Sequence, residues 1–241
     1  CNMINKIAIV TVHAGETNNL IKTMESVNSQ NVKPDLHLIV SKNYDGKILL
    51  HQKKYNKFIF KKDKSIYNAM NIGLRNTKDY FLLFLNSGDY LYSRNTIKVI
   101  KRFISLYKNK CIHFKTILEY KKKKFLKKDK IFNKKNFFSH PSFMRPPVNK
   151  LIFYNENLKI LSDGIWMKNN IKKYGIKKVN TITAVHTLGG VSTNPTSFSI
   201  KDNFKFSFQS GLKEIIKYFL KSFTSKKKYY EIIFRKNYLI K

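Results

Sequence analysis

The sequence predicts an α/β protein built on a doubly wound, mostly parallel sheet. Short apolar or β-branched runs alternate with amphipathic helical segments through the first half of the chain, which is the pattern of βαβ units. The apolar run 80–84 leads directly into LNSGD (85–89), so Asp89 follows a segment with the character of a buried strand. Ligands bind at that edge of open α/β sheets. The chain has only 14 Asp and Glu against 48 Lys and Arg, so a carboxylate at this position is a candidate functional group.

Each element follows from local periodicity. Strands are predicted at 6–12, 36–40, 58–60, 80–86, 111–120 and 176–186. Helices are predicted at 16–30, 65–75, 95–107 and 163–174. Their inward faces are expected to comprise Leu20, Ile21, Met24 and Val27, then Ile66, Ala69, Met70, Gly73 and Leu74, then Ile97, Ile100, Phe103 and Ile104.

The second half of the chain is less regular. A basic run with interleaved aromatic residues occupies 121–138, and the loop SHPSFMRPP follows at 139–147. Two basic amphipathic segments, LKEIIKYFLKSF and YYEIIFRKNYLI, lie after Gly211. We expect one domain over 1–205 and a basic, helical C-terminal tail over 206–241.

Composition narrows the function classes. A hydrophobic share of 42%, with 19 Phe and 14 Tyr, supports a packed core and excludes a disordered basic protein. The two cysteines, Cys1 and Cys111, exclude a disulfide framework and favour a reducing compartment. Neither a spanning apolar segment nor a signal peptide is predicted. A net charge of +34 predicts attraction to polyanions, either an anionic membrane or nucleic acid.

Asp89 and Asp63 are the first candidates for ligand binding. A carboxylate in the turn after a buried strand can hold Mg²⁺ or Mn²⁺, although Asp89 could equally cap the next turn. Asp63 precedes a helix whose N-cap is predicted at Ser65, and Arg75 on that helix could reach a phosphate. Asn68 and Asn71 are poor helix-interior residues, which indicates selection for something other than helix propensity.

Three further residues could carry chemistry. Asp163 could act as a general base for an acceptor hydroxyl, or could cap the helix that begins beside it. His140 and His186 flank this region, although a single histidine is more often structural. His186 precedes the loop Gly189-Gly190-Val191-Ser192-Thr193, which could fold over a ligand or could be a simple glycine turn.

Taken in order, these segments resemble family 2 glycosyltransferases of the GT-A fold, especially bacterial enzymes of capsule, lipopolysaccharide or exopolysaccharide synthesis. The resemblance covers roughly residues 5–195. It rests on KIAIVTVHAGETNNLIKTMESVNSQ, KDKSIYNAMNIGLRNTKDYFLLFLNSGDYLY, SHPSFM, LSDGIWMKNNIKKYG and LGGVS. It implies a Rossmann-like α/β/α sandwich with a nucleotide-sugar-binding half at 1–95 and an acceptor-binding half at 96–205. The implied reaction is an inverting, metal-dependent transfer from a nucleoside-diphosphate sugar, with a UDP-sugar favoured.

The resemblance also implies residue roles. Donor contacts are expected from Thr11, Val12, His13, Ser41, Asp63, Asn68, Asn71, Arg75, Ser87, Gly88 and Asp89. Asp89 would hold the Mn²⁺ or Mg²⁺ ion, and His186 would be a further metal or phosphate ligand. Asp163 would be the catalytic base, with His140 and Trp166 on the acceptor side. Ser41 and Asn68 stand where the family usually has Asp, and Ser87 and Gly88 leave a single acid in the metal motif.

Two other interpretations compete with this one. A nucleic-acid-binding protein would explain the charge and the aromatic-studded run 121–138, but would leave the placement of the scarce acids unexplained. An inactive GT-A domain would explain Ser41 and Asn68, and retention of Asp89 and Asp163 argues against it. We therefore expect a glycan or lipid-linked acceptor and no nucleic acid partner.

The tail is expected to bear on location. Lysines beside Phe219, Leu220, Phe223, Tyr229, Ile232 and Phe234 suit a helix lying on an anionic membrane, although a helix packed on the core would also expose its lysines. The expectation is a cytoplasmic enzyme, peripheral on the inner face of the bacterial plasma membrane.

Overall fold

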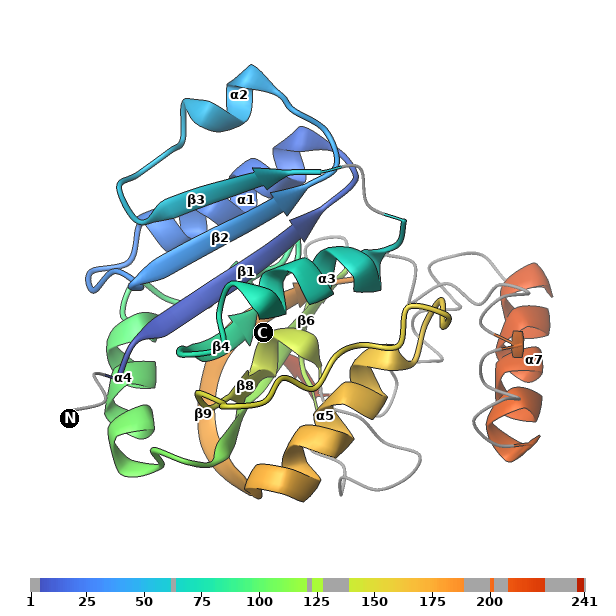
Figure 1. The fold of residues 1–241 in the computed structure, drawn as a ribbon. Helices are drawn as coiled ribbons and strands as arrows, with labels where there is room; N and C mark the ends of the chain where they lie inside the picture. Colours follow the sequence, from blue (N-terminus) through green and yellow to red (C-terminus); the bar gives the residue numbers. More distant parts are fainter. Residues whose placement is uncertain are drawn as a thin grey trace.

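The computed structural model describes residues 5–61, 64–120, 123–127, 139–188, 200–201, 208–223 and 238–240. Its first half is a series of βαβ units (Figure 1): β1 (Ile7–His13), α1 (Thr17–Asn28), β2 (Leu36–Ser41), α2 (Gly46–Leu49), β3 (Asn56–Phe60), α3 (Ile66–Arg75) and β4 (Phe81–Phe84). The short β5 (Tyr90–Leu91) and α4 (Thr96–Leu106) follow. Every strand predicted in this half is present, with shifts of a few residues at the ends.

The second half adds strands of both directions. It comprises β6 (Cys111–Tyr120), β7 (Lys123–Leu126), a 3₁₀ turn η1 (His140–Ser142), β8 (Phe143–Arg145), α5 (Ser162–Tyr174), β9 (Ile176–Thr187), α7 (Phe208–Phe223) and β10 (Tyr238–Ile240). Part of the basic run 121–138 is therefore a strand, because β7 pairs antiparallel with the end of β6. The tail also departs from expectation, since β10 pairs with β7 as a strand rather than continuing an amphipathic helix.

The described strands form one mixed sheet in the order β10-β7-β6-β8-β4-β1-β2-β3, with β9 beside β6 and β5. Strands β4, β1, β2 and β3 are parallel, so their carboxyl ends meet at one edge. Strand β8 runs antiparallel between β4 and β6, and β9 runs parallel to β6. The prediction of a mostly parallel sheet holds for the first half, while the second half contains the antiparallel strands.

Helices cover both faces of the sheet (Figure 1). On one face, α3 and α5 pack on alternate residues of β1, β2 and β4, among them Val10, Val40 and Phe84. On the other face, α1 and α4 cover the intervening residues, among them Ile9 and Leu83. Because successive residues of a strand point to opposite faces of the sheet, the same buried strands contribute side chains to both cores.

The predicted helix faces are largely confirmed, with one error. Leu20, Met24 and Val27 of α1 and Ile97, Ile100 and Ile104 of α4 are buried. Ile66, predicted to face inward, is 48% exposed. It occupies the first position of α3, directly after the N-cap Ser65, whose side chain accepts a hydrogen bond from the Asn68 backbone N–H. The next residue, Tyr67, is buried in the core instead, so the first turn of α3 packs through position 67 rather than 66.

Candidate functional site

The LNSGD loop is held against α1 at the carboxyl edge of β4. Gly88 has φ 98°, a left-handed conformation that favours glycine. Its backbone N–H donates to the Thr23 hydroxyl at 2.9 Å and to the Asn19 carbonyl at 3.1 Å. The Thr23 hydroxyl in turn donates to the Asp89 carbonyl at 2.7 Å. Thr23 is a fully buried polar residue on the apolar face of α1, and the sequence prediction did not include it.

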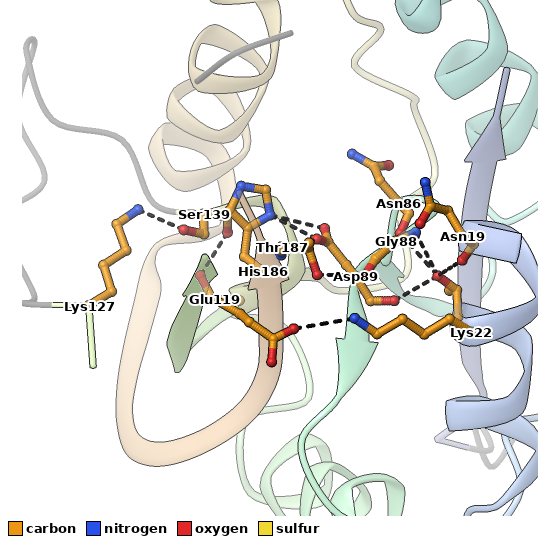
Figure 2. Close-up of polar contacts among 12 residues, drawn as sticks. Asn19, Lys22, Asn86, Gly88, Asp89, Glu119, Lys127, Ser139, His186 and Thr187 are labelled. Atoms are coloured by element: carbon orange, nitrogen blue, oxygen red, sulfur yellow. Dashed lines mark hydrogen bonds and ion pairs between the residues drawn. The ribbon is translucent and has the colours of Figure 1, made fainter. Parts of the chain in front are cut away.

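Asp89 is buried and is joined to the end of β9, 97 residues away (Figure 2). Its carboxylate oxygens lie 2.9 Å and 3.1 Å from His186 Nδ1. The Thr187 backbone N–H donates to Asp89 Oδ1 at 2.9 Å, and the Thr187 hydroxyl donates to the Gly88 carbonyl at 2.8 Å. A buried carboxylate requires such partners. The two residues predicted as metal ligands therefore meet in one place.

A second polar cluster anchors this region from β6. The Glu119 carboxylate accepts a hydrogen bond from the Tyr90 hydroxyl at 2.9 Å and lies 3.3 Å from Lys22 Nζ (Figure 2). Its backbone carbonyl accepts from the Leu188 N–H at 2.8 Å. Leu188, the residue after the His186–Thr187 pair, is therefore hydrogen-bonded to β6. On the other side of the site, Lys127 Nζ donates to the Ser139 hydroxyl at 2.7 Å.

His140 is close enough to both Asp89 and Asp163 to be affected by their charges. Burial lowers the pKa of His140, while the charges of Asp163 and then Asp89 act to raise it. The Tyr154 hydroxyl lies 2.9 Å from His140 Nε2, and the imidazole stacks on Phe84 at 5.3 Å between ring centroids. His140 is therefore a neutral, buried ring within electrostatic reach of both carboxylates.

Asp163 lies in the first turn of α5 and is partly exposed. The N-cap position of this helix belongs to Leu161, and Asp163 Oδ1 accepts a hydrogen bond from the neighbouring Gly164 N–H at 2.8 Å. Its charge also raises the pKa of Tyr154, after the larger effect of burial. Asp163 is thus an accessible carboxylate on the same side as His140, and it is not the helix cap.

The carboxyl edge of β1 carries a further polar group. His13 Nδ1 lies 3.0 Å from the Ser87 hydroxyl, which joins two of the predicted donor-binding residues. Asp45, the N-cap of α2, accepts a hydrogen bond from the Thr17 hydroxyl at 2.6 Å, and this bond is the main cause of its lowered pKa. The pKa of His13 is lowered by burial, and the nearby charge of Asp45 partly offsets this by raising it. Asp45 is an ionised group at this edge that the predicted site did not include.

Several predicted donor contacts are turned inward. The Thr11 hydroxyl is buried and donates to the Leu85 carbonyl at 2.8 Å, and Val12 belongs to the apolar core. The Ser41 hydroxyl is buried and donates to the Asn43 carbonyl at 2.7 Å, which closes the turn after β2. These three side chains support the edge from within, because alternate strand residues face the two cores.

Trp166 also requires a correction. It was expected on the acceptor side, yet only 1% of it is exposed. Its indole N–H donates to the Ile152 carbonyl at 2.9 Å, and its ring stacks on Tyr154 at 4.9 Å. Trp166 is therefore a core residue that supports the segment between β8 and α5.

Asn68, Asn71 and Arg75 of α3 do not meet the Asp89 cluster. The two amides bind Glu156, on the segment between β8 and α5. Arg75 is in the last turn of α3, at the other end of the helix from Ser65. Its guanidinium lies over the Phe153 ring, 5.1 Å from the ring centroid. Asp63 and the glycine loop 189–193 lie outside the described residues.

Among the residues that the structure describes, Asp89 and His186 are the candidate metal ligands at this edge. Within the described part of the chain, no group of three or more His, Cys, Asp or Glu side chains is arranged to hold a metal ion. Carboxylate oxygen and imidazole nitrogen are ligand types that Mn²⁺ accepts, but in this structure His186 Nδ1 and the Asp89 carboxylate are hydrogen-bonded to each other, so an ion would have to replace that bond. Substrate oxygens and water would have to complete such a site, as is usual for metals that bridge phosphates.

The fold is shared with glycosyltransferases of known structure. Staphylococcus aureus TarS 1–349 in complex with UDP-GlcNAc is 14% identical, with a TM-score of 0.63 over 95% of this chain and 71% of that chain. Another S. aureus TarS structure is 13% identical, with a TM-score of 0.59 over 94% of this chain and 45% of that one. The Pyrobaculum calidifontis mannosyltransferase PcManGT, in complex with GDP-Man and Mn²⁺, is 8% identical, with a TM-score of 0.55 over 95% and 68%.

Sequence comparison adds no closer relative. No protein-family model matches the chain, and no curated protein matches it by sequence. The structural likeness nevertheless extends over nearly the whole chain, so the protein has a GT-A glycosyltransferase fold. This agrees with the fold that the sequence motifs predicted.

Proposed function

We propose that this protein is a glycosyltransferase that moves a sugar from a nucleoside-diphosphate sugar to a glycan or lipid-linked acceptor in bacterial surface polysaccharide synthesis. The observation that carries the proposal is the buried Asp89–His186 pair at the carboxyl edge of β4, with Asp163 within electrostatic reach of the adjacent histidine, His140. The glycosyltransferase fold supports it. Of the donor nucleotides, uridine diphosphate is favoured by the sequence resemblance.

The donor would bind along the edge formed by β1, β2 and β4. His13 and Ser87 are joined there, and Asp45 offers an ionised carboxylate suited to hydrogen-bonding a base or ribose. Open α/β sheets bind nucleotides at this edge because the loops after parallel strands converge there. The inward-facing Thr11 and Ser41 would hold these loops in position.

The diphosphate would lie at Asp89. Asp89 and His186 would hold an Mn²⁺ or Mg²⁺ ion. When bound, the ion would stabilise the negative charge that develops on the leaving diphosphate. The contacts from Thr187 to Gly88 and Asp89 would keep the two ligands together before the ion binds.

Asp163 would act as the general base in an inverting transfer. Its carboxylate is partly exposed, and the hydrogen bond from Gly164 engages one oxygen, which leaves lone pairs for an acceptor hydroxyl. His140 and Tyr154 would form the wall beside it.

We place the protein at the cytoplasmic face of the plasma membrane, with α7 as the contact. The helix exposes an apolar stripe made of Leu212, Ile216, Phe219 and Phe223. Lys213, Lys217 and Lys221 follow at four-residue intervals on a neighbouring face. Apolar residues flanked by lysines suit the interface of an anionic bilayer. None of the helices in the described ranges has the length and apolar character needed to cross a bilayer.

The donor site is tested by thermal unfolding with UDP, GDP, dTDP and CMP, each with and without Mn²⁺. A nucleotide at one hundred times its Kd should stabilise the fold by about 2.7 kcal/mol, which raises Tm by roughly 5–10 °C in a chain of this size. We expect one nucleotide to act only with metal, and Asp89→Asn to abolish its effect. The matched control is Asp79→Asn, an exposed acid at the other end of β4. Absence of any nucleotide shift in the wild type would contradict the proposal.

The catalytic base is tested by Asp163→Asn. Loss of a general base lowers kcat by about 10²–10⁴-fold. We expect a loss in this range, measured as sugar transfer with a fixed donor, while the nucleotide-induced Tm shift stays unchanged. A loss of less than about tenfold would exclude Asp163 as the base.

A further inference from the structure

The face of α3 that the sequence assigned to the donor binds a different partner. Tyr67, Asn68 and Asn71 face the segment 152–160, which has almost no regular secondary structure and connects β8 to α5. Figure 1 shows this segment, in yellow, running beside α3 toward α5. The segment contains a carboxylate, Glu156, and α3 provides the groups that bind it.

The Glu156 carboxylate accepts one hydrogen bond from each asparagine, and Asn71 also exchanges hydrogen bonds with the Tyr154 backbone. Asn71 is 2% exposed, and its Nδ2 donates to Glu156 Oε1 at 2.7 Å and to the Tyr154 carbonyl at 3.1 Å. The Tyr154 N–H donates back to Asn71 Oδ1 at 2.8 Å. Asn68 Nδ2 donates to Glu156 Oε2 at 2.9 Å. Each carboxylate oxygen thus meets an amide nitrogen that can only donate, which fits an ionised glutamate.

Electrostatics agree with this geometry. The pKa of Glu156 is lowered, first by the hydrogen bond from Asn71 and then by that from Asn68, with smaller effects from Arg75 and Lys64. This also explains why two asparagines interrupt a helix that would otherwise favour better helix formers. We refer to Asn68, Asn71 and Glu156 as the latch.

The segment held by the latch leads to the proposed acceptor side. The Tyr154 hydroxyl lies 2.9 Å from His140, and the Asn155 N–H donates to the Ser162 hydroxyl at 2.6 Å, one residue before Asp163. The Tyr67 hydroxyl donates to the Ile160 carbonyl at 2.6 Å. Both ends of the segment are therefore tied to α3, a helix of the donor half.

We propose that Asn68, Asn71 and Glu156 are positioning residues that fix Asp163 and His140 relative to the bound donor. This inference rests on the proposed function. A displacement of about 1 Å at a reacting group can cost 10²-fold in rate, so a small movement of this segment would lower kcat without weakening donor binding. If the two asparagines instead contacted the donor directly, as the sequence resemblance implied, their replacement would weaken donor binding.

A charge-exchange cycle tests the latch. Asn68→Asp places a carboxylate against Glu156, and Glu156→Gln places amide donors face to face. In the double variant, the new amide at position 156 can accept from Asn71 through its oxygen and donate through its nitrogen to the new carboxylate at position 68, so both bonds form again. Asn157→Asp adds the same charge at an exposed position of the same segment and is the control.

We expect Asn68→Asp to lower kcat by about 10- to 100-fold, with the Kd of the donor nucleotide changed less than about twofold. The double variant should recover kcat to within about threefold of the wild type. Asn157→Asp should match the wild type. Amide exchange at Tyr154, whose N–H binds Asn71, should be faster in Asn68→Asp and restored in the double variant.

Any of three results would overturn the inference. Loss of nucleotide affinity in Asn68→Asp would indicate that Asn68 contacts the donor, and faster exchange at Tyr154 with unchanged kcat would indicate a purely structural role. The third is a double variant whose kcat does not recover. A wild-type protein without transfer activity for any donor would refute the proposed function itself, and this inference with it. That case is distinguished because the wild-type assay alone reveals it.

Discussion

His37 is a buried histidine whose protonation state is set by its neighbours. It is fully buried on β2, and Asn56 Nδ2 donates to its Nδ1 at 3.1 Å. Its Nε2 therefore carries the proton and donates to the Thr11 hydroxyl at 2.9 Å, while Thr11 donates to the Leu85 carbonyl. This chain of hydrogen bonds links β3, β2, β1 and the residue before Asn86, directly beneath the proposed donor site.

This arrangement predicts an acid-dependent loss of stability. Burial lowers the pKa of His37 to about 3 from 6.5. Between those values the unfolded chain binds a proton that the folded chain does not, so stability is full above about pH 6.5 and falls as the pH decreases toward 3. The slope is about 1.4 kcal/mol per pH unit for this one group.

His37→Gln should be less stable at pH 7, yet its free energy of unfolding should fall less steeply between about pH 6 and 4, by about 1.4 kcal/mol per pH unit. Urea unfolding at several pH values measures this. The matched comparison is His51→Gln, at a partly exposed histidine on the surface. Equal slopes for His37→Gln and the wild type would show that His37 is not the buried neutral group described above.

At the scale of elements, the approach of α3 to the sheet depends on Gly73. A Cβ at this position would lie 2.6 Å from Val10 Cγ1 and 3.6 Å from the Phe84 ring. Alanine normally stabilises a helix interior relative to glycine by about 1 kcal/mol. Overpacking against a buried strand costs about 1–3 kcal/mol, so the packing effect should exceed the gain in helix propensity.

Gly73→Ala should therefore lower the free energy of unfolding, in contrast to its effect in an exposed helix. Removing the obstructing methyl groups in Gly73→Ala/Val10→Ala should give less destabilisation than the two single changes added together. Denaturant unfolding of the wild type, the two single variants and the double variant measures the coupling. A stabilised Gly73→Ala protein would mean that α3 lies farther from β1 than described.

At the scale of the whole molecule, the charge of +34 and the exposed stripe of α7 would both favour the proposed contact with an anionic membrane. Figure 1 shows α7 beside the body of the protein rather than over the sheet. Phe223 is 83% exposed, so its replacement does not disturb a core. The alternative, a C-terminal helix packed through its apolar face, does not fit these exposed side chains.

Phe223→Ser should weaken binding to vesicles of anionic lipid by about tenfold or more, since burying a phenylalanine contributes about 1.5–3 kcal/mol. Tyr218→Ser removes an aromatic ring on the same helix but off the stripe, and should have a smaller effect. Co-sedimentation at physiological salt measures both. Failure of the wild type to be retained on such vesicles would refute the membrane contact.

The sequence alone determined most of the elements and the carboxyl-edge position of Asp89. Strand alternation and helical spacing are local properties, so they survive without knowledge of the fold. The same reasoning predicted the cap at Ser65, which the structure confirms. Local reasoning could not establish which partner each predicted polar residue contacts. Spacing along the chain shows which residues share a face of a helix or strand, but not which other segment packs against that face.

Tertiary structure decided the composition of the site. Only the pairing of β9 with β5 and β6 brings His186 to Asp89, across 97 residues. Only the path of segment 152–160 turns Asn68 and Asn71 toward Glu156, and only the packing of α5 buries Trp166. These are contacts between distant parts of the chain, whose energies depend on how the sheet is ordered, and no local pattern encodes that order.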